Sequence, residues 1–158
     1  MLTAHLPAGY VLAHAFDRNK RALWAATMIG SVLPDFDLLF FYFVDGRSVH
    51  HHRYWVHVPA FWAVCAIGVL PILWVIERLR VLLAPALVFL AAILLHLVLD
   101  TISGGILWAA PFSDQLFTLV TVPATQHHWI LSFLLHWTFV LELLIWSAAF
   151  LLWKRGRT

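Results

Sequence analysis

The chain has 158 residues, of which 63% are hydrophobic and 11% are charged, and its formal net charge is +2. Soluble domains contain about 45–50% apolar and about 25% charged residues, and a chain of this length buries only about 70% of its surface. The composition therefore excludes a soluble globular protein and a disordered one, and predicts one integral-membrane domain, residues 1–158, in a lipid bilayer. No basic patch or nucleic-acid motif is present, so nucleic acid is excluded as a partner.

Five apolar stretches follow one another along the chain, and about 20 residues suffice to cross a hydrocarbon core of about 30 Å. They cover residues 2–16, 22–44, 56–76, 81–101 and 129–153. The last three are long and uninterrupted. The first is short, and the second contains Pro34, which disfavours helix at Leu33 and lacks a backbone N–H. We predict an all-α, polytopic helical bundle of about five membrane helices, two of them short or broken.

Most of the Lys and Arg residues fall in three clusters that alternate with these stretches. The clusters are Arg18, Lys20 and Arg21; Arg78 and Arg80; and Lys154, Arg155 and Arg157. Five helices place all three on one face, and the positive-inside rule makes that face cytoplasmic. We therefore predict a multi-pass protein of the inner (plasma) membrane, with its N-terminus outside and its C-terminus in the cytoplasm. No basic region precedes the first stretch, so we expect no removable signal peptide.

Ionisable residues from four helices reach one depth near the predicted outer interface. At 1.5 Å of rise per residue, Asp35 lies roughly 21 Å and His96 roughly 24 Å from the basic end of its helix. The same arithmetic brings His5 and His57 to a similar level. We therefore predict one site for metal near the extracytoplasmic interface, built from His5, Asp35, Asp37, His52, His57, His96 and Asp100.

The residue types in this set indicate the kind of ion. His96 and Asp100 are four residues apart and project from one face of a helix, which suits two ligands of one ion. Imidazole and carboxylate together favour a divalent transition metal, zinc first, with manganese or iron as alternatives. Seven candidates exceed the four ligands of a structural zinc, so one or two ions bind, or some of these residues orient the ligands.

Simpler explanations stay open for part of this set and for the other polar residues. A lone His in a bundle is often only hydrogen-bonded to a neighbouring helix, and the pair His96 and Asp100 could be an ion pair that caps a helix. Ionised groups at membrane depth are costly and usually functional, which favours a site for the set as a whole. The sequence leaves open the roles of His14, His50, His51, His127, His128, His136 and Glu142.

A family resemblance rests on the same residues. In chain order they are His5, P-D-F-D at 34–37, H-R-x3-H at 52–57, and H-x3-D-T-x2-G-G-I-x-W-x2-P-F at 96–112. With this combination the chain resembles the YdjM/YbcI family of membrane-bound metal-dependent hydrolases, which is distantly similar to zinc-dependent phospholipase C. The resemblance implies metal-dependent hydrolysis of a phosphoester. Val58 stands where members commonly have Ser, and the last apolar stretch lacks the H-x3-E of the soluble three-metal relatives.

These observations favour a membrane-embedded, metal-dependent hydrolase that cleaves a phosphoester of a membrane lipid or another amphipathic substrate at the outer interface. A bound metal would lower the pKa of a water molecule toward about 7. We assign catalytic roles to Arg53, whose planar guanidinium matches phosphate oxygens, and to Asp37. The alternatives are a proton-coupled or metal-ion transporter, and a membrane protein whose metal is purely structural.

Overall fold

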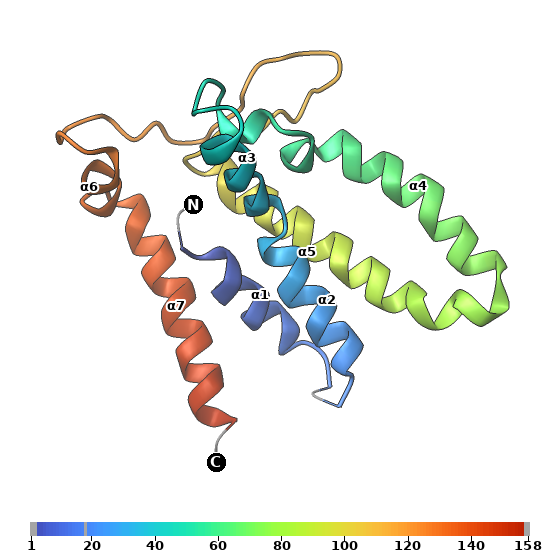
Figure 1. The fold of residues 1–158 in the computed structure, drawn as a ribbon. Helices are drawn as coiled ribbons and strands as arrows, with labels where there is room; N and C mark the ends of the chain where they lie inside the picture. The colour runs from blue at the N-terminus through green and yellow to red at the C-terminus, as the bar shows by residue number, and fades with distance from the viewer. Residues whose placement is uncertain (1–2, 18, 157–158) are drawn as a thin grey trace.

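The structure, a computed structural model, describes residues 3–17 and 19–156 and is built from helices (Figure 1), in agreement with the predicted all-α class. The α-helices are α1 (His5–Ala13), α2 (Arg21–Val32), α3 (Asp37–Phe43), α4 (Pro59–Val75), α5 (Leu83–Thr101), α6 (Trp129–Leu134) and α7 (Thr138–Arg155). Short 3-10 helices connect several of them: η1 (Pro34–Phe36), η2 (His51–Arg53), η3 (Trp55–His57) and η4 (Glu77–Leu82).

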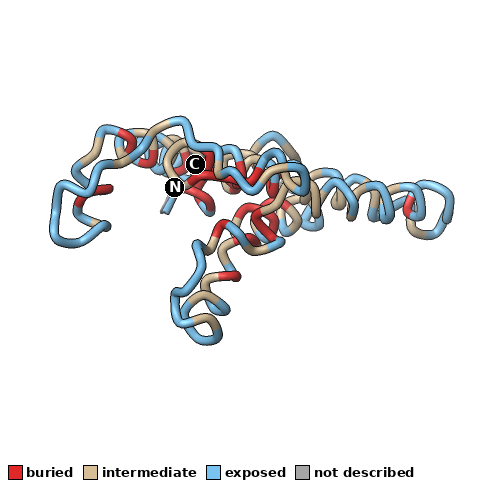
Figure 2. The backbone as a smooth tube through the Cα atoms, turned by 90° about the horizontal axis from the view of Figure 1, so that it is seen from above, coloured by how far each residue is buried: buried red, intermediate tan, exposed pale blue. Residues whose placement is uncertain are grey.

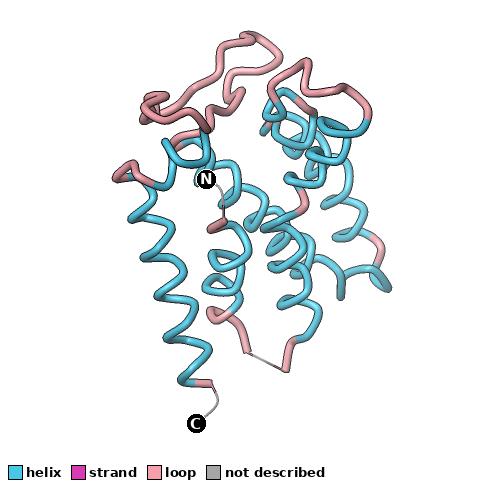
Figure 3. Tube along the Cα trace, turned by 60° about the vertical axis from the view of Figure 1, so that its left-hand side comes forward, coloured by secondary structure: helices cyan, strands magenta, loops and turns pink. Residues whose placement is uncertain are grey.

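The centre of the molecule is formed by α1, α2 and α5, with α2 packed extensively on α5. α7 lies along α1, and α4 folds back on α5 through η4 (Figure 1). Figure 2 shows that buried positions gather where the central helices meet and become sparse along the arms that project from them. The connection between α1 and α2 and the end of α7 lie at one end of the bundle, and the long loops lie at the other (Figure 3).

Two glycines permit the close packing of the three central helices. A Cβ atom at Gly9 of α1 would lie 2.2 Å from the Ser31 Oγ of α2. A Cβ atom at Gly30 of α2 would lie 2.7 Å from the Phe89 carbonyl oxygen of α5. Small residues at helix interfaces of membrane proteins let the backbones approach in this way. The end of α2 is thereby held against the half of α5 that carries His96.

The predicted interruption at Pro34 is confirmed. α2 ends at Val32, Pro34 opens η1, and α3 continues the chain in a new direction. The segments Arg21–Val32 and Pro34–Phe43 are bent by 49° relative to each other. Proline has no N–H to continue the α-helical ladder, and its ring disfavours helix in the residue before it. Beyond the bend, the Asp35 carboxylate lies 3.7 Å from His96 of α5, and the Asp37 carboxylate contacts His57 of η3.

The predicted unbroken helix over 129–153 is wrong. The structure divides this stretch into two helices, α6 and α7, which are separated over residues 135–137. Backbone N–H groups there bond three residues back, from His136 to Phe133 and from Phe139 to His136, instead of four. The His136 Nδ1 also lies 2.9 Å from the Thr138 hydroxyl, a local side-chain contact that accompanies the break. Such side-chain contacts compete with the regular helix.

Among the residues that the structure describes, one segment, Glu77–Thr101, is long and apolar enough to cross a membrane by itself. The bent pair Arg21–Val32 and Pro34–Phe43 would be a second if it acts as one span, and α4 is apolar but shorter. The count of about five membrane helices and the orientation therefore stay predictions. Arg18 and Arg157, which contributed to the orientation, lie outside the described residues.

Candidate metal centre

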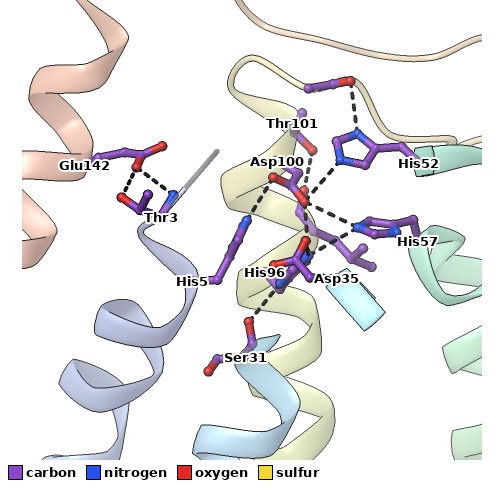
Figure 4. A network of polar contacts seen from close by, with 12 residues as sticks. Thr3, His5, Ser31, Asp35, His52, His57, His96, Asp100, Thr101 and Glu142 are labelled. Carbon is purple, nitrogen blue, oxygen red and sulfur yellow. Dashed lines mark hydrogen bonds and ion pairs between the residues drawn. The ribbon is translucent and has the colours of Figure 1, made fainter. Parts of the chain in front are cut away.

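His and Asp side chains from five separate elements meet at one end of the central helices (Figure 4). They are His5 at the start of α1, Asp35 in η1, His52 in η2, His57 at the end of η3, and His96 and Asp100 in α5. All except Asp35 are at most 4% exposed. The structure thus brings together the residues that the helical rise places at one depth.

Asp100 lies at the middle of this cluster. Its Oδ2 is 3.1 Å from the Nε2 of His96 and 3.6 Å from the Nε2 atoms of both His52 and His57. Its Oδ1 is 3.1 Å from the Nε2 of His5. The Nε2 atoms of His57 and His96 are themselves 3.3 Å apart. Four imidazoles therefore direct the same ring nitrogen toward one carboxylate.

Three of these imidazoles are oriented through their other nitrogen. The Nδ1 of His52 is 2.8 Å from the Gly105 carbonyl oxygen, and the Nδ1 of His96 is 2.8 Å from the Ser31 carbonyl oxygen. The Nδ1 of His57 is 2.6 Å from the Asp37 Oδ2. Carbonyl and carboxylate oxygens only accept, so each Nδ1 carries the proton. In a neutral ring, Nε2 then presents its lone pair, which is the arrangement typical of metal-binding His.

His5 is held differently. Its ring stacks on the His96 ring with a centroid distance of 3.7 Å. Its Nδ1 has no hydrogen-bond partner within the described residues. The segment that carries it is instead fixed by Thr3, two residues before His5, whose N–H and hydroxyl donate to the Glu142 Oε2 of α7 at 2.8 and 2.6 Å. His5 is therefore positioned by the packing of α1 against α7.

The glycine pair in the loop after α5 makes room for His52. A Cβ atom at Gly104 would lie 2.3 Å from the His52 Cε1, closer than real contacts allow. Gly105 has φ +77°, a left-handed conformation that favours glycine. The two glycines thus let the carbonyl groups of the loop reach the ring nitrogen of His52. This explains their position directly after the H-x3-D motif.

The donor atoms fit a transition-metal ion. At metal–ligand distances of about 2.0–2.1 Å, neighbouring donors of a tetrahedral zinc ion lie about 3.3 Å apart. The separations around Asp100 are 3.1 to 3.6 Å. When His57 is deprotonated, the Nε2 lone pairs face the buried Asp100 carboxylate, and a metal cation bound there would pair this buried charge. The residues of the site could therefore hold a metal ion.

Two sets of potential donor atoms can be distinguished, and within each set all donors lie within 4.8 Å of one another. One set is His5, Asp35, His96 and Asp100; the other is His51, His52 and His57. Sequence reasoning left His51 open, and only the run of three His pointed to it. Two adjacent sets agree with the predicted capacity for one or two ions. The identity of the metal stays a prediction.

Asp35 and Asp37 have different surroundings although only Phe36 separates them. Asp35 has a side chain that is 32% exposed, and its Oδ1 lies 3.7 Å from the His96 Nε2. Asp37 is buried on the Nδ1 side of His57 and outside both donor sets. Asp35 can therefore serve as a ligand at the open side of the site. The place of Asp37 differs from the predicted ligand role and suits a carboxylate that orients His57.

Protonation differs between His52 of η2 and His57 of η3. Burial lowers the pKa of His52 to about 3, so this ring is neutral at physiological pH. Burial also acts to lower the pKa of His57, but its contacts with Asp100 and Asp37 outweigh burial and raise the pKa to about 9. Without metal, His57 therefore holds a proton between two carboxylates, in the place where a metal cation would bind.

Arg53, the predicted phosphate-binding residue, is exposed at the end of η2. Its Nη2 donates to the Asp114 carbonyl oxygen at 3.4 Å, a long hydrogen bond to the loop after α5. Asp45 is engaged by the Tyr54 hydroxyl. Arg53 thus lies at the surface next to a buried donor, His52, with its guanidinium only weakly held.

Comparison with protein families matches residues 1–156 to the family described as YdjM inner membrane protein. The chain belongs to the YdjM inner membrane protein family. No curated protein and no solved structure matches the chain significantly. The family assignment agrees with the resemblance carried by the His and Asp motifs, and it places the metal-binding geometry in a protein of the inner membrane.

Proposed function

We propose that the protein is a metal-dependent hydrolase that cleaves a phosphoester of a lipid or another amphipathic substrate at the outer interface of the inner membrane. The observation that carries this proposal is the convergence of the Nε2 atoms of His52, His57 and His96 on the Asp100 carboxylate. Each of these three rings donates through its Nδ1 to a buried acceptor, which fixes the direction of its Nε2. A bound zinc, manganese or iron ion would supply an activated water molecule and stabilise charge on a phosphoryl oxygen.

The chain's own residues would divide the remaining work. Asp37 holds His57 with its Nε2 directed inward, and Ser31 does the same for His96. Asp35 is the most exposed member of the cluster and borders the side from which a substrate would enter. Oriented ligands and an open side are what a catalytic metal site needs, whereas a structural site is closed.

Arg53 is proposed to bind the substrate phosphate. A guanidinium offers two parallel N–H donors to phosphate oxygens, and as a permanent cation it cannot ligate the metal. The present hydrogen bond to the Asp114 carbonyl is long, so little is lost when the side chain turns to an anionic substrate. His52 directly precedes it in η2, so a phosphate held by Arg53 would lie beside the cluster.

The experiment compares the purified wild type with Arg53→Lys and Arg53→Ala, and with Arg80→Lys near the start of α5 as the matched control. Metal content is measured by elemental analysis, and headgroup release is measured on a panel of phospholipids and polyprenyl phosphates. Loss of a charge-assisted hydrogen bond of about 1.5–3 kcal/mol corresponds to roughly a ten- to hundredfold lower rate. We expect this loss in Arg53→Lys with metal retained, and wild-type rates in Arg80→Lys.

Full activity of Arg53→Ala would remove Arg53 from the site. Wild-type protein that binds metal but releases no headgroup from any member of the panel would contradict the hydrolase proposal and favour the transport or structural-metal alternatives.

A further inference from the structure

An apolar groove of about 410 Å³ lies between α1, α2 and α7. It is lined among others by Leu6 and Tyr10 of α1, Met28 of α2, and Trp146, Ala149 and Trp153 of α7, which present only apolar atoms to it. Its volume falls within the range of roughly 300–1,000 Å³ that is usual for ligand sites. The function proposed above does not use this groove.

The groove begins beside the metal centre. Leu6 directly follows His5, whose Nε2 lies 3.1 Å from the Asp100 Oδ1. Trp146 also borders this end, because its Nε1 donates to the Thr3 hydroxyl at 3.1 Å. From there the groove follows α7 to Trp153, a distance of about 10 Å at 1.5 Å per residue. One end is therefore adjacent to the cluster and the other extends along the helices.

The cross-section of the groove suits a thin and flexible occupant. Ala149 is 8% exposed and forms the floor, whereas Trp146 and Phe150 on the same helix are 49% and 57% exposed and project beside it. A second copy of the chain would have to place a side chain or helix between these rings. A hydrocarbon chain can lie along the floor, and the inner membrane supplies such chains at high concentration.

We propose that this groove binds one hydrocarbon chain of the substrate, so that the substrate class is a long-chain phosphoester whose phosphate reaches the His and Asp cluster. This inference rests on the proposed hydrolase function and extends it. Lipid tails are as apolar as the groove, so moving a chain from bilayer to groove brings little hydrophobic gain. The groove acts instead by orientation, because a held chain fixes where the headgroup lies.

The variants for the test are Ala149→Trp, which fills the floor, and Met28→Trp, which fills the groove from the opposite wall. Ala148→Trp is the matched control, since Ala148 is the neighbour of Ala149 and does not line the groove. Metal content and elution as a single species are measured for each variant. The variants on opposite walls make the test independent of a folding defect in either one.

The first measurement needs no activity. A hexadecylphosphocholine with a photoactivatable diazirine at the end of its chain is crosslinked to the purified metal-loaded protein, and labelled peptides are mapped. We expect labelling of α1 and α7 that excess hexadecylphosphocholine abolishes and glycerophosphocholine does not. Labelling should fall at least fivefold in Ala149→Trp and Met28→Trp and persist in Ala148→Trp. If excess hexadecylphosphocholine does not abolish labelling, or if labelling is equal in all variants, the proposal that the groove binds a hydrocarbon chain is wrong.

The second measurement compares hydrolysis of hexadecyl and methyl p-nitrophenyl phosphate. The preference for the hexadecyl ester, as a ratio of kcat/KM values, should fall at least tenfold in Ala149→Trp, with the methyl ester unaffected. If Ala149→Trp hydrolyses both esters at normal rates and the ratio of kcat/KM values is unchanged, the proposal that the groove binds a chain is wrong, whereas the hydrolase function stands. A third outcome is crosslinking that excess ligand abolishes and that falls in the groove variants, while the wild type hydrolyses no phosphoester. This outcome would support the groove as a chain-binding site and contradict the hydrolase function.

Discussion

The two sides of the metal centre are held in contrasting ways. On one side, His52, His57 and His96 each donate through Nδ1 to a buried oxygen, within 2.6 to 2.8 Å. On the other side, the His5 ring is held by stacking on His96 and by the anchoring of Thr3 to Glu142. On the first side, a separate hydrogen bond fixes the orientation of each ring. On the second side, the position of His5 depends on how α1 and α7 pack.

This difference indicates which residues decide binding and which adjust it. Hydrogen bonds from a ligand's second nitrogen fix its tautomer and direction, so their loss acts directly on metal affinity. A ligand positioned by packing can relax when the packing changes, which makes its contribution smaller and easier to modulate. The effects of substitutions should therefore fall in a definite order across the site.

The largest effect is expected for Asp100→Asn. The carboxylate lies within 3.1 to 3.6 Å of four imidazoles, and the amide keeps its shape but removes the charge that pairs with the ion. Purified protein should lose nearly all bound metal. The thermal midpoint measured with added zinc should no longer rise with zinc concentration, because that rise requires binding to the folded state. Wild-type metal content in this variant would remove Asp100 from the site.

Asp37→Asn should lower metal affinity by about 10- to 100-fold, the range typical for residues that orient a ligand. The amide can still accept from the Nδ1 of His57, but it no longer carries the charge that raises the basicity of the ring. Competition with a zinc chelator measures the change. An equal loss in Asp37→Asn and Asp100→Asn would instead make Asp37 a ligand.

Of His52 and His57, only His57 should contribute to the pH dependence of metal binding. With a pKa of about 9 in the metal-free protein, His57 is protonated at pH 7 and must release its proton before Nε2 binds a cation. Apparent affinity should thus rise about tenfold per pH unit between pH 7 and 8. His52, with a pKa of about 3, releases none. Calorimetry in buffers of different ionisation enthalpy counts the protons, and release of none would contradict this assignment.

The smallest effect is expected for Glu142→Leu, which removes the acceptor of both Thr3 hydrogen bonds. Energies transmitted through such contacts are about 0.5–2 kcal/mol, so metal affinity should fall about two- to thirtyfold. Ser147→Ala on the same helix is the control. If Glu142 acts through His5, the double variant with His5→Ala should lose no more affinity than His5→Ala alone. Additive losses would separate Glu142 from the centre.

Helical rise made part of the centre predictable. Asp35, His96 and Asp100 lie on or directly beside regular helices, where 1.5 Å per residue fixes depth, and the structure brings them together with His5 and His57. The position of Asp37 relative to His57 was not predictable, because it depends on the bend at Pro34 and on the conformation of η3. The contact between Thr3 and Glu142 joins residues 139 positions apart, and no local pattern signals it. The break before Thr138 likewise depends on a side-chain contact inside an apolar stretch.

The contact between Thr3 and Glu142 also has a consequence for the order in which the protein is made. His5 is synthesised well before the residue that anchors its segment, because Glu142 follows 139 positions after Thr3. At about 5–20 residues per second, a ribosome needs roughly 7–28 s to cover that distance. During this interval a nascent chain can already carry His52, His57, His96 and Asp100. The position of His5 is fixed only after α7 has been synthesised. A chain that ends before α7 would therefore have an incomplete metal centre, in which His5 lacks its anchor.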